Sequence, residues 1–325
     1  MKKRRLLLQG IAAMAGAHAL SSHSQSGFPA KPVRLVIPFT PGGSTDILGR
    51  AIAQALSESW KQSVVAENRP GAGGAIGADA VAKSAPDGYT LLMGHIGTLA
   101  VNPNLYAKLP YNPLTDFSPL ALVGLVPNVL VVSPNLPVKN LADFIALAKA
   151  KPGSLNYASG GVGSAAHLGM EYFKLATGTD IVHVPYKGTA PAMTDLIGGQ
   201  VSVSMTGLPP LLGHLRAGKL RALGVASAAR LEQIPDVPTI ASAGVPGFEA
   251  TQWYGVVGPA KMAAPLVDQI AGEIRRALAR PDLKKRLEDE GALPSNMGPA
   301  EFRNMIAVEI ERWGKVIRAA KIQSE

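Results

Sequence analysis

Cysteine is absent from this chain of 325 residues. Its absence excludes disulfide bonds, cysteine-ligated zinc, thiol catalysis and a cysteine-linked lipid anchor. Aromatic residues are also scarce, at 5% of the sequence, whereas there are 35 glycines. This composition favours many strand–loop–helix junctions over a helical bundle. Hydrophobic residues make up 47% of the chain, so it can bury one or two cores, and its length favours two domains.

Long apolar runs are rare, and a short one lies at the N-terminus. Residues 1–5 (MKKRR) are basic, residues 6–20 (LLLQGIAAMAGAHAL) are apolar, and Ala17-His18-Ala19 fits a small-x-small cleavage site. The pattern predicts a signal peptide and leader over 1–27, with export to the periplasm by the general or the twin-arginine route. No later stretch approaches the about 20 apolar residues of a membrane span, so we expect the mature protein to be soluble.

The charges do not indicate a nucleic-acid partner. The formal net charge is +9, and the predicted signal peptide carries four basic residues and no acid, which leaves 9 − 4 = +5. The remaining Lys and Arg are scattered or lie among acids on helical patterns, as on solvated faces. The six histidines show no H-x-H or H-E-x-x-H spacing, so the sequence predicts no metal site and no cofactor.

Short apolar runs alternate with amphipathic segments along the chain. The alternation predicts right-handed βαβ units, and hence an α/β fold of mixed, mainly parallel sheets with helices on both faces. The expected strands cover 33–39, 63–68, 89–95, 155–160, 181–188, 201–207, 220–227 and 253–260, and the expected helices include 75–85, 141–150, 265–279 and 300–320. Residues 234–248 are expected to form a long loop.

The chain is expected to leave its first domain and return to it. Residues 120–134 read as two strand-like runs interrupted at Pro127-Asn128, long enough to pass between domains. We therefore predict domain 1 from residues 28–126 and 253–325, and domain 2 from residues 127–252. Two crossings between domains make a hinge.

Two glycine-rich turns share one pattern. PGGSTD (41–46) and GGVGS (160–164) each follow an expected strand and precede an expected helix. A helix N-terminus leaves N–H groups unpaired and carries the positive end of the helix dipole, so each turn can accept an anion. Because the turns lie in different predicted domains, they predict a clamp for a carboxylate without a cationic side chain. The alternative is that both are merely tight turns.

Other readings of the two turns are weaker. Residues 161–166 match G-x-G-x-x-A, but the acid that a dinucleotide site needs about 20 residues later is not clearly placed. The first turn lacks the Lys of a phosphate-binding loop. Ser164 and His167 suggest a nucleophile and base, but there is no G-x-S-x-G elbow, and neighbours three apart on one helix align poorly. A histidine that packs or braces the loop is the default.

Several side chains keep two interpretations. Asp46 either offsets the dipole of its helix or binds an ammonium or hydroxyl group of a ligand. Lys187 either faces the cleft or is an exposed loop lysine. The aromatics of QWYG (252–255) either pack in the core or cover a ligand.

The combined motifs resemble the Bug family, the periplasmic solute-binding components of tripartite tricarboxylate transporters. The resemblance runs over essentially the whole mature chain and is carried by PFTPGGSTDILGR, ENRPGAGGAIGADAVAKSAPDGYTLLMG, LPYNPLTDFSPLALV, ASGGVGSAAHL, VPYKGTAPAMTDLIGGQV, AGKLRALGV and DVPTIASAGVPGFEATQWYG. It implies a two-domain, type II periplasmic-binding-protein (Venus flytrap) fold and no enzymatic activity. It also implies a small carboxylate ligand held by backbone groups and bridging waters in the loops at 40–46 and 159–164.

The resemblance assigns ligand-binding residues to this sequence and no catalytic or metal-binding ones. In the family the loop after the third strand often begins with an Asn- or Thr-rich segment, so His95 and Ile96 are departures that leave the ligand's identity open. We expect a monomer that binds a di- or tricarboxylate or related acid and meets membrane subunits. An exported hydrolase and a module that feeds a sensor are the alternatives. The predicted ligand-binding residues are Pro41, Gly42, Gly43, Ser44, Asp46, Gly97, Thr98, Ser159, Gly160, Gly163, Ser164, Tyr186 and Lys187.

Overall fold

The computed structural model describes residues 27–320 and 322. The fold below is that of the compact unit that begins at Lys31. The predicted signal peptide lies outside the described residues, except for residue 27 at its end. Among the described helices, none combines the length and the apolar character that crossing a bilayer requires.

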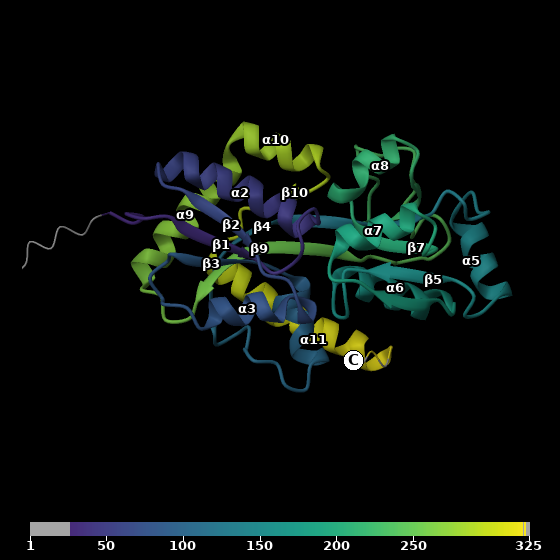
Figure 1. Ribbon diagram of the computed structural model, residues 1–325, viewed down its shortest axis with the longest axis horizontal. Coiled ribbons are helices and arrows are strands. Elements are labelled where there is room, and N and C mark those ends of the chain that lie inside the picture. The colour runs from purple at the N-terminus through teal and green to yellow at the C-terminus, as the bar shows by residue number, and fades with distance from the viewer. Residues whose placement is uncertain (1–26, 321, 323–325) are drawn as a thin grey trace, which may run out of the picture. The chain divides into compact units, whose positions relative to one another are not determined.

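The first three strands form a parallel group. Strand β1 (Val33–Ile37) pairs with β2 (Val64–Asn68) on one side and with β3 (Thr90–His95) on the other. All of β3 and most of β1 are buried, as expected of strands covered on both faces. The connecting helices α2 (Ser44–Trp60) and α3 (Ala75–Ala82) lie on opposite sides of these strands (Figure 1).

A second parallel group repeats this arrangement. Strand β5 (Asn156–Ser159) pairs with β6 (Val182–Pro185) and with β7 (Val203–Gly207). The other elements of this region are α5 (Leu141–Ala150), α6 (Ala165–Thr177), α7 (Thr189–Ile197), the 3₁₀ turn η3 (Pro209–Leu211), α8 (Leu212–Arg216) and β8 (Arg221–Val225). Residues 234–248 form no helix or strand, in agreement with the loop predicted there.

One long strand, β4 (Phe117–Val132), links the two groups. It pairs with β9 (Thr251–Pro259) as far as Pro127, and with β7 from Asn128 onward. The sequence predicted two runs interrupted at Pro127-Asn128, which is wrong, because the strand continues through them. Pro127 has no N–H to donate, and it lies where one ladder ends and the next begins, a position that a proline tolerates.

The sheet is mixed, as predicted, but parallel pairs do not predominate. Strands β7, β8, β9 and the short β10 (Leu293–Pro294) all run antiparallel to β4, and β3 runs antiparallel to β9. Among the described strands there are four parallel and five antiparallel pairs. The difference arises because β4 and β9 cross the molecule in opposite directions between the two parallel groups.

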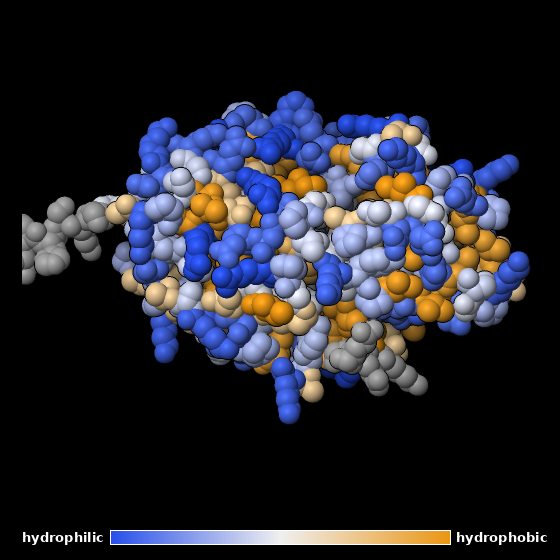
Figure 2. Space-filling model, in the orientation of Figure 1, coloured by the Kyte–Doolittle hydropathy of each residue, from blue (hydrophilic) through white to orange (hydrophobic). Residues whose placement is uncertain are grey.

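The C-terminal helices cover the first group. They are α9 (Ala264–Ala279), α10 (Pro281–Asp289) and α11 (Pro299–Ala319). The region after residue 260 was expected to be helical, which α10 fits, but the sequence reading missed η1 (Ala72–Gly74), the π-helix η2 (Gly97–Val101) and α4 (Asn102–Leu105). Hydrophilic side chains predominate on the surface of α2 and α10 in the view of Figure 2.

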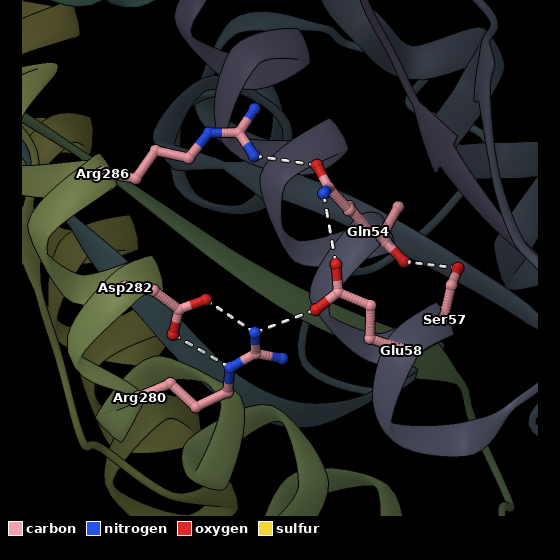
Figure 3. Close-up of polar contacts among 7 residues, drawn as sticks. Gln54, Ser57, Glu58, Arg280, Asp282 and Arg286 are labelled. Atoms are coloured by element: carbon pink, nitrogen blue, oxygen red, sulfur yellow. Dashed lines mark hydrogen bonds and ion pairs between the residues drawn. The ribbon is translucent and has the colours of Figure 1, made fainter.

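Polar contacts fasten α2 to the junction of α9 and α10 (Figure 3). Arg280 donates to Glu58 at 2.9 Å and to Asp282 at 2.6 Å, and Arg286 donates to Gln54 at 2.9 Å. The Arg280 guanidinium lowers the pKa of both carboxyls. These contacts are exposed, so each adds little stability, but together they orient the helix that begins at the first glycine-rich turn.

The main core of the first group packs α11 against β9. Phe302 is fully buried, and its ring meets Trp253 edge to face at a centroid distance of 5.7 Å. Gly255 makes room for it, because a Cβ there would overlap the Phe302 ring. Glycine is therefore required at position 255 because the Phe302 ring packs directly against the backbone there, and not because the chain turns.

Behind the second glycine-rich turn lies a stack of rings. His167 on α6 stacks on His183 of β6 at 4.2 Å between centroids, and His183 stacks on Tyr157 of β5 at 4.7 Å. Tyr157 donates its hydroxyl to Glu171 at 2.6 Å, and Lys174 pairs with the same carboxylate. Burial, followed by nearby positive charge, lowers the pKa of His167 to about 4 and that of His183 to about 3.

We expect Phe302→Ala to destabilise the protein by about 3–5 kcal/mol, because it removes a buried aromatic ring and leaves a cavity. Val308 on the same helix is 64% exposed, so Val308→Ala should change stability by less than about 0.5 kcal/mol. Urea unfolding of both variants measures this. Equal effects of the two would contradict the packing described.

The ring stack predicts that stability falls as the pH drops from about 6.5 to about 4. In this window the unfolded chain binds protons on His167 and His183 that the folded chain refuses, and one unit of lowered pKa corresponds to about 1.4 kcal/mol. Urea unfolding at a series of pH values measures the slope. In His167→Asn/His183→Gln, the amides keep the hydrogen-bonding positions without titrating, and the slope should decrease. An unchanged slope would assign the pH dependence to other groups.

Candidate functional site

A small cavity of about 30 Å³ lies where both glycine-rich turns meet. None of the side chains that line it is Asp, Glu, Lys or Arg. The lining residues are Phe39, Gly43, Ser44, Thr45, His95, Gly160, Ser164, Ala165, Ala166, Thr189, Thr206, Gln252 and Tyr254. Phe39 and Gly160 also line an adjoining cavity of about 290 Å³. The polar interior and the larger chamber beside it make this the candidate binding site.

The first turn presents the start of α2. Gly43 caps this helix without a side-chain hydrogen bond, so the first-turn amides have no side-chain acceptor at the cap. Ser44 and Thr45 follow and bring their hydroxyls to the cavity. An uncapped N-terminus with hydroxyls beside it can donate to an anion.

Asp46 does not line this cavity. Its carboxylate accepts from Gly42 N–H at 3.0 Å, from Arg50 Nε at 2.9 Å and from Asn68 Nδ2 at 2.9 Å. Although burial opposes ionisation, these donors lower the pKa of Asp46. The carboxylate is therefore engaged within the protein, where it holds the first turn, and a direct contact with the ligand stays a prediction.

The second glycine-rich turn is held by hydrogen bonds to Ser159 and His167. Ser159 Oγ lies 2.7 Å from His183 Nε2 and accepts from Gly161 N–H at 3.1 Å. Gly163 N–H donates to His167 Nδ1 at 3.1 Å. Gly163 has a φ of +77°, and a Cβ there would lie 2.8 Å from Leu105 Cδ2, so the turn needs glycine at this position.

Ser164 and His167 form a helix cap. Ser164 Oγ accepts from the backbone N–H of His167 at 3.3 Å, while the His167 ring bonds to Gly163 as described. In each of these two hydrogen bonds the donor is a backbone N–H group, so the Ser164 hydroxyl and the His167 ring are not bonded to each other. Ser164 also lines the cavity, where its hydroxyl proton is available to a ligand.

A third helix N-terminus faces the cavity, and although a helix was expected here, the sequence reading did not assign its start to the site. α7 starts after Gly188, which caps it without a side-chain bond. Its first residue, Thr189, lines the cavity opposite Gly43, where a Cβ would lie 3.2 Å from Thr189 Oγ1. The signal was present in YKGTAP, a glycine followed by a helix start after an expected strand, which is the pattern of the other two turns.

His95 closes another wall of the cavity. It ends β3, and its Nδ1 accepts from Gly97 N–H at 2.8 Å and from Thr98 N–H at 3.3 Å. Thr98 Oγ1 in turn accepts from His95 N–H at 3.1 Å and donates to His95 O at 3.0 Å. Burial lowers the pKa of His95 to about 4. Gly97 and Thr98 thus hold His95 and do not themselves line either cavity.

Strand β9 supplies the floor. Gln252 and Tyr254 face the cavity, while Trp253 between them packs into the core, which is the alternation of a strand. Tyr254 donates to Gln252, and Gln252 donates to Asn128 on β4. Burial raises the pKa of Tyr254. The sequence analysis had left open whether the aromatics of QWYG pack in the core or cover a ligand. Because side chains alternate along the strand, Trp253 packs in the core and Tyr254 faces the cavity.

The structure separates the predicted site residues into three groups. Those that line the cavity are Gly43, Ser44, Gly160 and Ser164. Those on the adjoining cavity are Tyr186 and Lys187, together with Gly160. Those that line neither cavity are Pro41, Gly42, Asp46, Gly97, Thr98, Ser159 and Gly163. Most of the last group hold the turns in position. Over the described part of the chain, no cluster of His, Asp or Glu has the grouping of a metal site.

Comparison with known proteins identifies the family. Residues 48–322 match the model of the tripartite tricarboxylate transporter family receptor. Protein BugT of Bordetella pertussis is 43% identical over 296 residues, which cover 91% of each chain. Rpa4515 of R. palustris, solved with adipate, is 40% identical with a TM-score of 0.89, covering 92% of this chain and all of that one.

A further solved structure agrees with the fold. The periplasmic binding protein BugD is 32% identical with a TM-score of 0.88, again over 92% of this chain and all of that one. The fold class predicted from the sequence, that of periplasmic binding proteins, is therefore confirmed. The chain belongs to the tripartite tricarboxylate transporter receptor family, whose Bug proteins its motifs resemble.

Proposed function

We propose that this protein binds a carboxylate group of a small organic acid in the cavity between the glycine-rich turns and delivers the acid to a membrane transporter. One observation carries the proposal: three helix N-termini, those of α2, α6 and α7, contribute Gly43, Ser164 and Thr189 to one uncharged cavity. Their dipoles and N–H groups favour an anion there. The adipate found with Rpa4515 is a carboxylate of this kind.

Closure of the two predicted domains on the ligand would follow from the way the chain passes between them. The N-terminus of α2 comes from residues before β4, whereas α6 and α7 come after it. We place the domain boundaries near 126/127 and 252/253, because β4 changes partner at Pro127–Asn128. A ligand that touches both sides would then favour the closed arrangement by its difference in affinity.

The adjoining cavity gives Tyr186 and Lys187 a role. We assign the remainder of the ligand to this cavity, which Gly160 joins to the smaller one. Tyr186 donates its hydroxyl to Asp195 at 2.6 Å, which fixes the ring. Lys187 is exposed at the rim, where a cation favours the approach of an acid.

The cellular setting follows from the family. We assign the protein to the periplasm, reached through the predicted N-terminal signal, and its partners to the membrane subunits of a tripartite transporter. We expect it to act as a monomer. A hydrolase based on Ser164 and His167 finds no support in the site, because the bonds of these groups go to the backbone.

Binding is tested with the mature protein and a panel of organic acids. At least one acid should raise the melting temperature in a concentration-dependent manner, because a ligand that binds only the folded state stabilises it by mass action. Calorimetric titration then gives the dissociation constant. If no di-, tri- or monocarboxylate bound at millimolar concentration, the proposed function would be refuted.

Gly43→Val should abolish this binding. Its side chain would fill the space between α2 and Thr189, and φ at Gly43 is −86°, so the backbone tolerates a Cβ. Thermal unfolding should stay cooperative. Gly213→Val is the control, because its added Cβ would meet no atom within 4 Å beyond its chain neighbours and the backbone of its own helix. Gly163→Val should also lose binding, but its positive φ makes loss of stability the expected cause. Wild-type affinity in Gly43→Val would rule out this cavity.

A further inference from the structure

His95 lines the cavity with a side chain whose proton position is fixed by its neighbours. Two backbone N–H groups, those of Gly97 and Thr98, donate to its Nδ1. A ring nitrogen can accept only when it carries no proton, so in the neutral ring the proton is on Nε2. The arrangement requires Gly97, because a Cβ there would overlap His95 Cε1.

The Nε2–H group has no protein acceptor among the described residues. His95 is 4% exposed and lines the cavity, yet no hydrogen bond of Nε2 accompanies the two bonds of Nδ1. Its neighbours in ring contact are Phe39 at 4.5 Å and Tyr254 at 5.9 Å. Nε2 is not among the buried side-chain atoms of the described residues that lack a partner, so its N–H opens to the cavity, where a ligand can supply an acceptor.

We propose that His95 is the specificity-determining residue of this site: its Nε2–H donates to a carboxylate oxygen of the ligand and restricts the ligand to acids without an α-ammonium group. The proposal rests on the proposed function and narrows the ligand from organic acids in general to non-amino acids.

Charge explains why an ammonium group is rejected. No carboxylate lines the cavity, and the nearby Asp46 is already bonded to Gly42, Arg50 and Asn68. A buried cation without a counter-charge is strongly unfavourable. His95 makes the binding of an ammonium group still less favourable, because its Nε2–H is a donor and an ammonium group needs an acceptor.

Phe39 also disfavours a ligand with an α-ammonium group. Its ring borders the cavity beside His95, so the atoms next to the bound carboxylate meet an apolar surface there. A methylene group suits that position, whereas a charged substituent would lose its hydration without compensation. The α-carbon of the ligand is therefore expected to carry hydrogen.

Two variants separate the donor from the fold around it. In His95→Asn the amide oxygen replaces Nδ1, so the bonds to Gly97 and Thr98 are kept while the Nε2 donor is lost. In His95→Gln the amide nitrogen replaces Nε2, so the donor is kept. Affinity for a non-amino acid should fall about tenfold or more in the Asn variant, as expected for a lost hydrogen bond to a charged group. It should fall less in the Gln variant.

The ligand probes are three matched pairs: succinate and aspartate, glutarate and glutamate, adipate and 2-aminoadipate. Calorimetry with the mature protein should show the non-amino member of the best-binding pair bound about 100-fold more tightly, the scale set by an unmatched buried charge. His95→Asp, which introduces an acceptor, should reduce that ratio at least tenfold. His214→Asn on α8, outside the cavity, is the control and should leave the ratio unchanged.

The outcomes are distinct. If no acid binds the wild type, the proposed function falls, and this inference with it. If acids bind but His95→Asn retains wild-type affinity, or both members of the best-binding pair bind equally, only the inference is overturned. Should the variants fail to fold, ¹⁵N-histidine NMR of the wild type decides: the Nε2–H signal must be present and must shift on addition of the bound acid, and an unmoved signal overturns the proposal.

Discussion

The internal neutralisation of Asp46 is the constraint on which the rest of the site depends. Its carboxylate takes donors from Gly42, Arg50 and Asn68, so it orients the first turn and the start of α2 without presenting charge to the cavity. Were the carboxylate free to face inward, an anion would be repelled from the same helix N-terminus that attracts it. One aspartate thus holds the shape of the turn and keeps the cavity suitable for an acid.

Several polar groups that line the cavity are positioned in a similar way, by a bond to a neighbouring protein group. His95 is held by Gly97 and Thr98, and Ser164 by the N–H of His167. Tyr254 and Gln252 are linked in series to Asn128 on β4. Neutral donors gain little from long-range attraction, so their contribution depends on being oriented before the ligand arrives. The glycines at 97 and 163 are required because these supporting bonds bring backbone close to side chains.

The sequence predicted the fold class and both glycine-rich turns, because strand–turn–helix patterns are local. It did not predict which strands would be neighbours. β9 enters between β3 and β4, a pairing of segments more than 120 residues apart, and this brings Gln252 and Tyr254 beneath the turns. For the same reason, Thr206 could not be assigned to the site from sequence, whereas the signal for Thr189 was present in the local pattern of a glycine before a helix start. Asp46, Gly97 and Thr98 were predicted to bind the ligand, and the three-dimensional contacts add that they hold Gly42 and His95 in position.

A cavity without charged side chains also has consequences for release. A carboxylate paired with a buried arginine gains strong attraction, but separating the pair leaves an uncompensated charge in the protein. Here the donors are amides, hydroxyls and one imidazole, which water can satisfy when the two sides part. Affinity then depends on how many donors reach the acid at once, and the proposed opening would remove them together. In the proposed transport function, the protein could therefore bind the acid tightly and release it completely through one movement about β4 and β9, the strands where the chain passes between the two predicted domains.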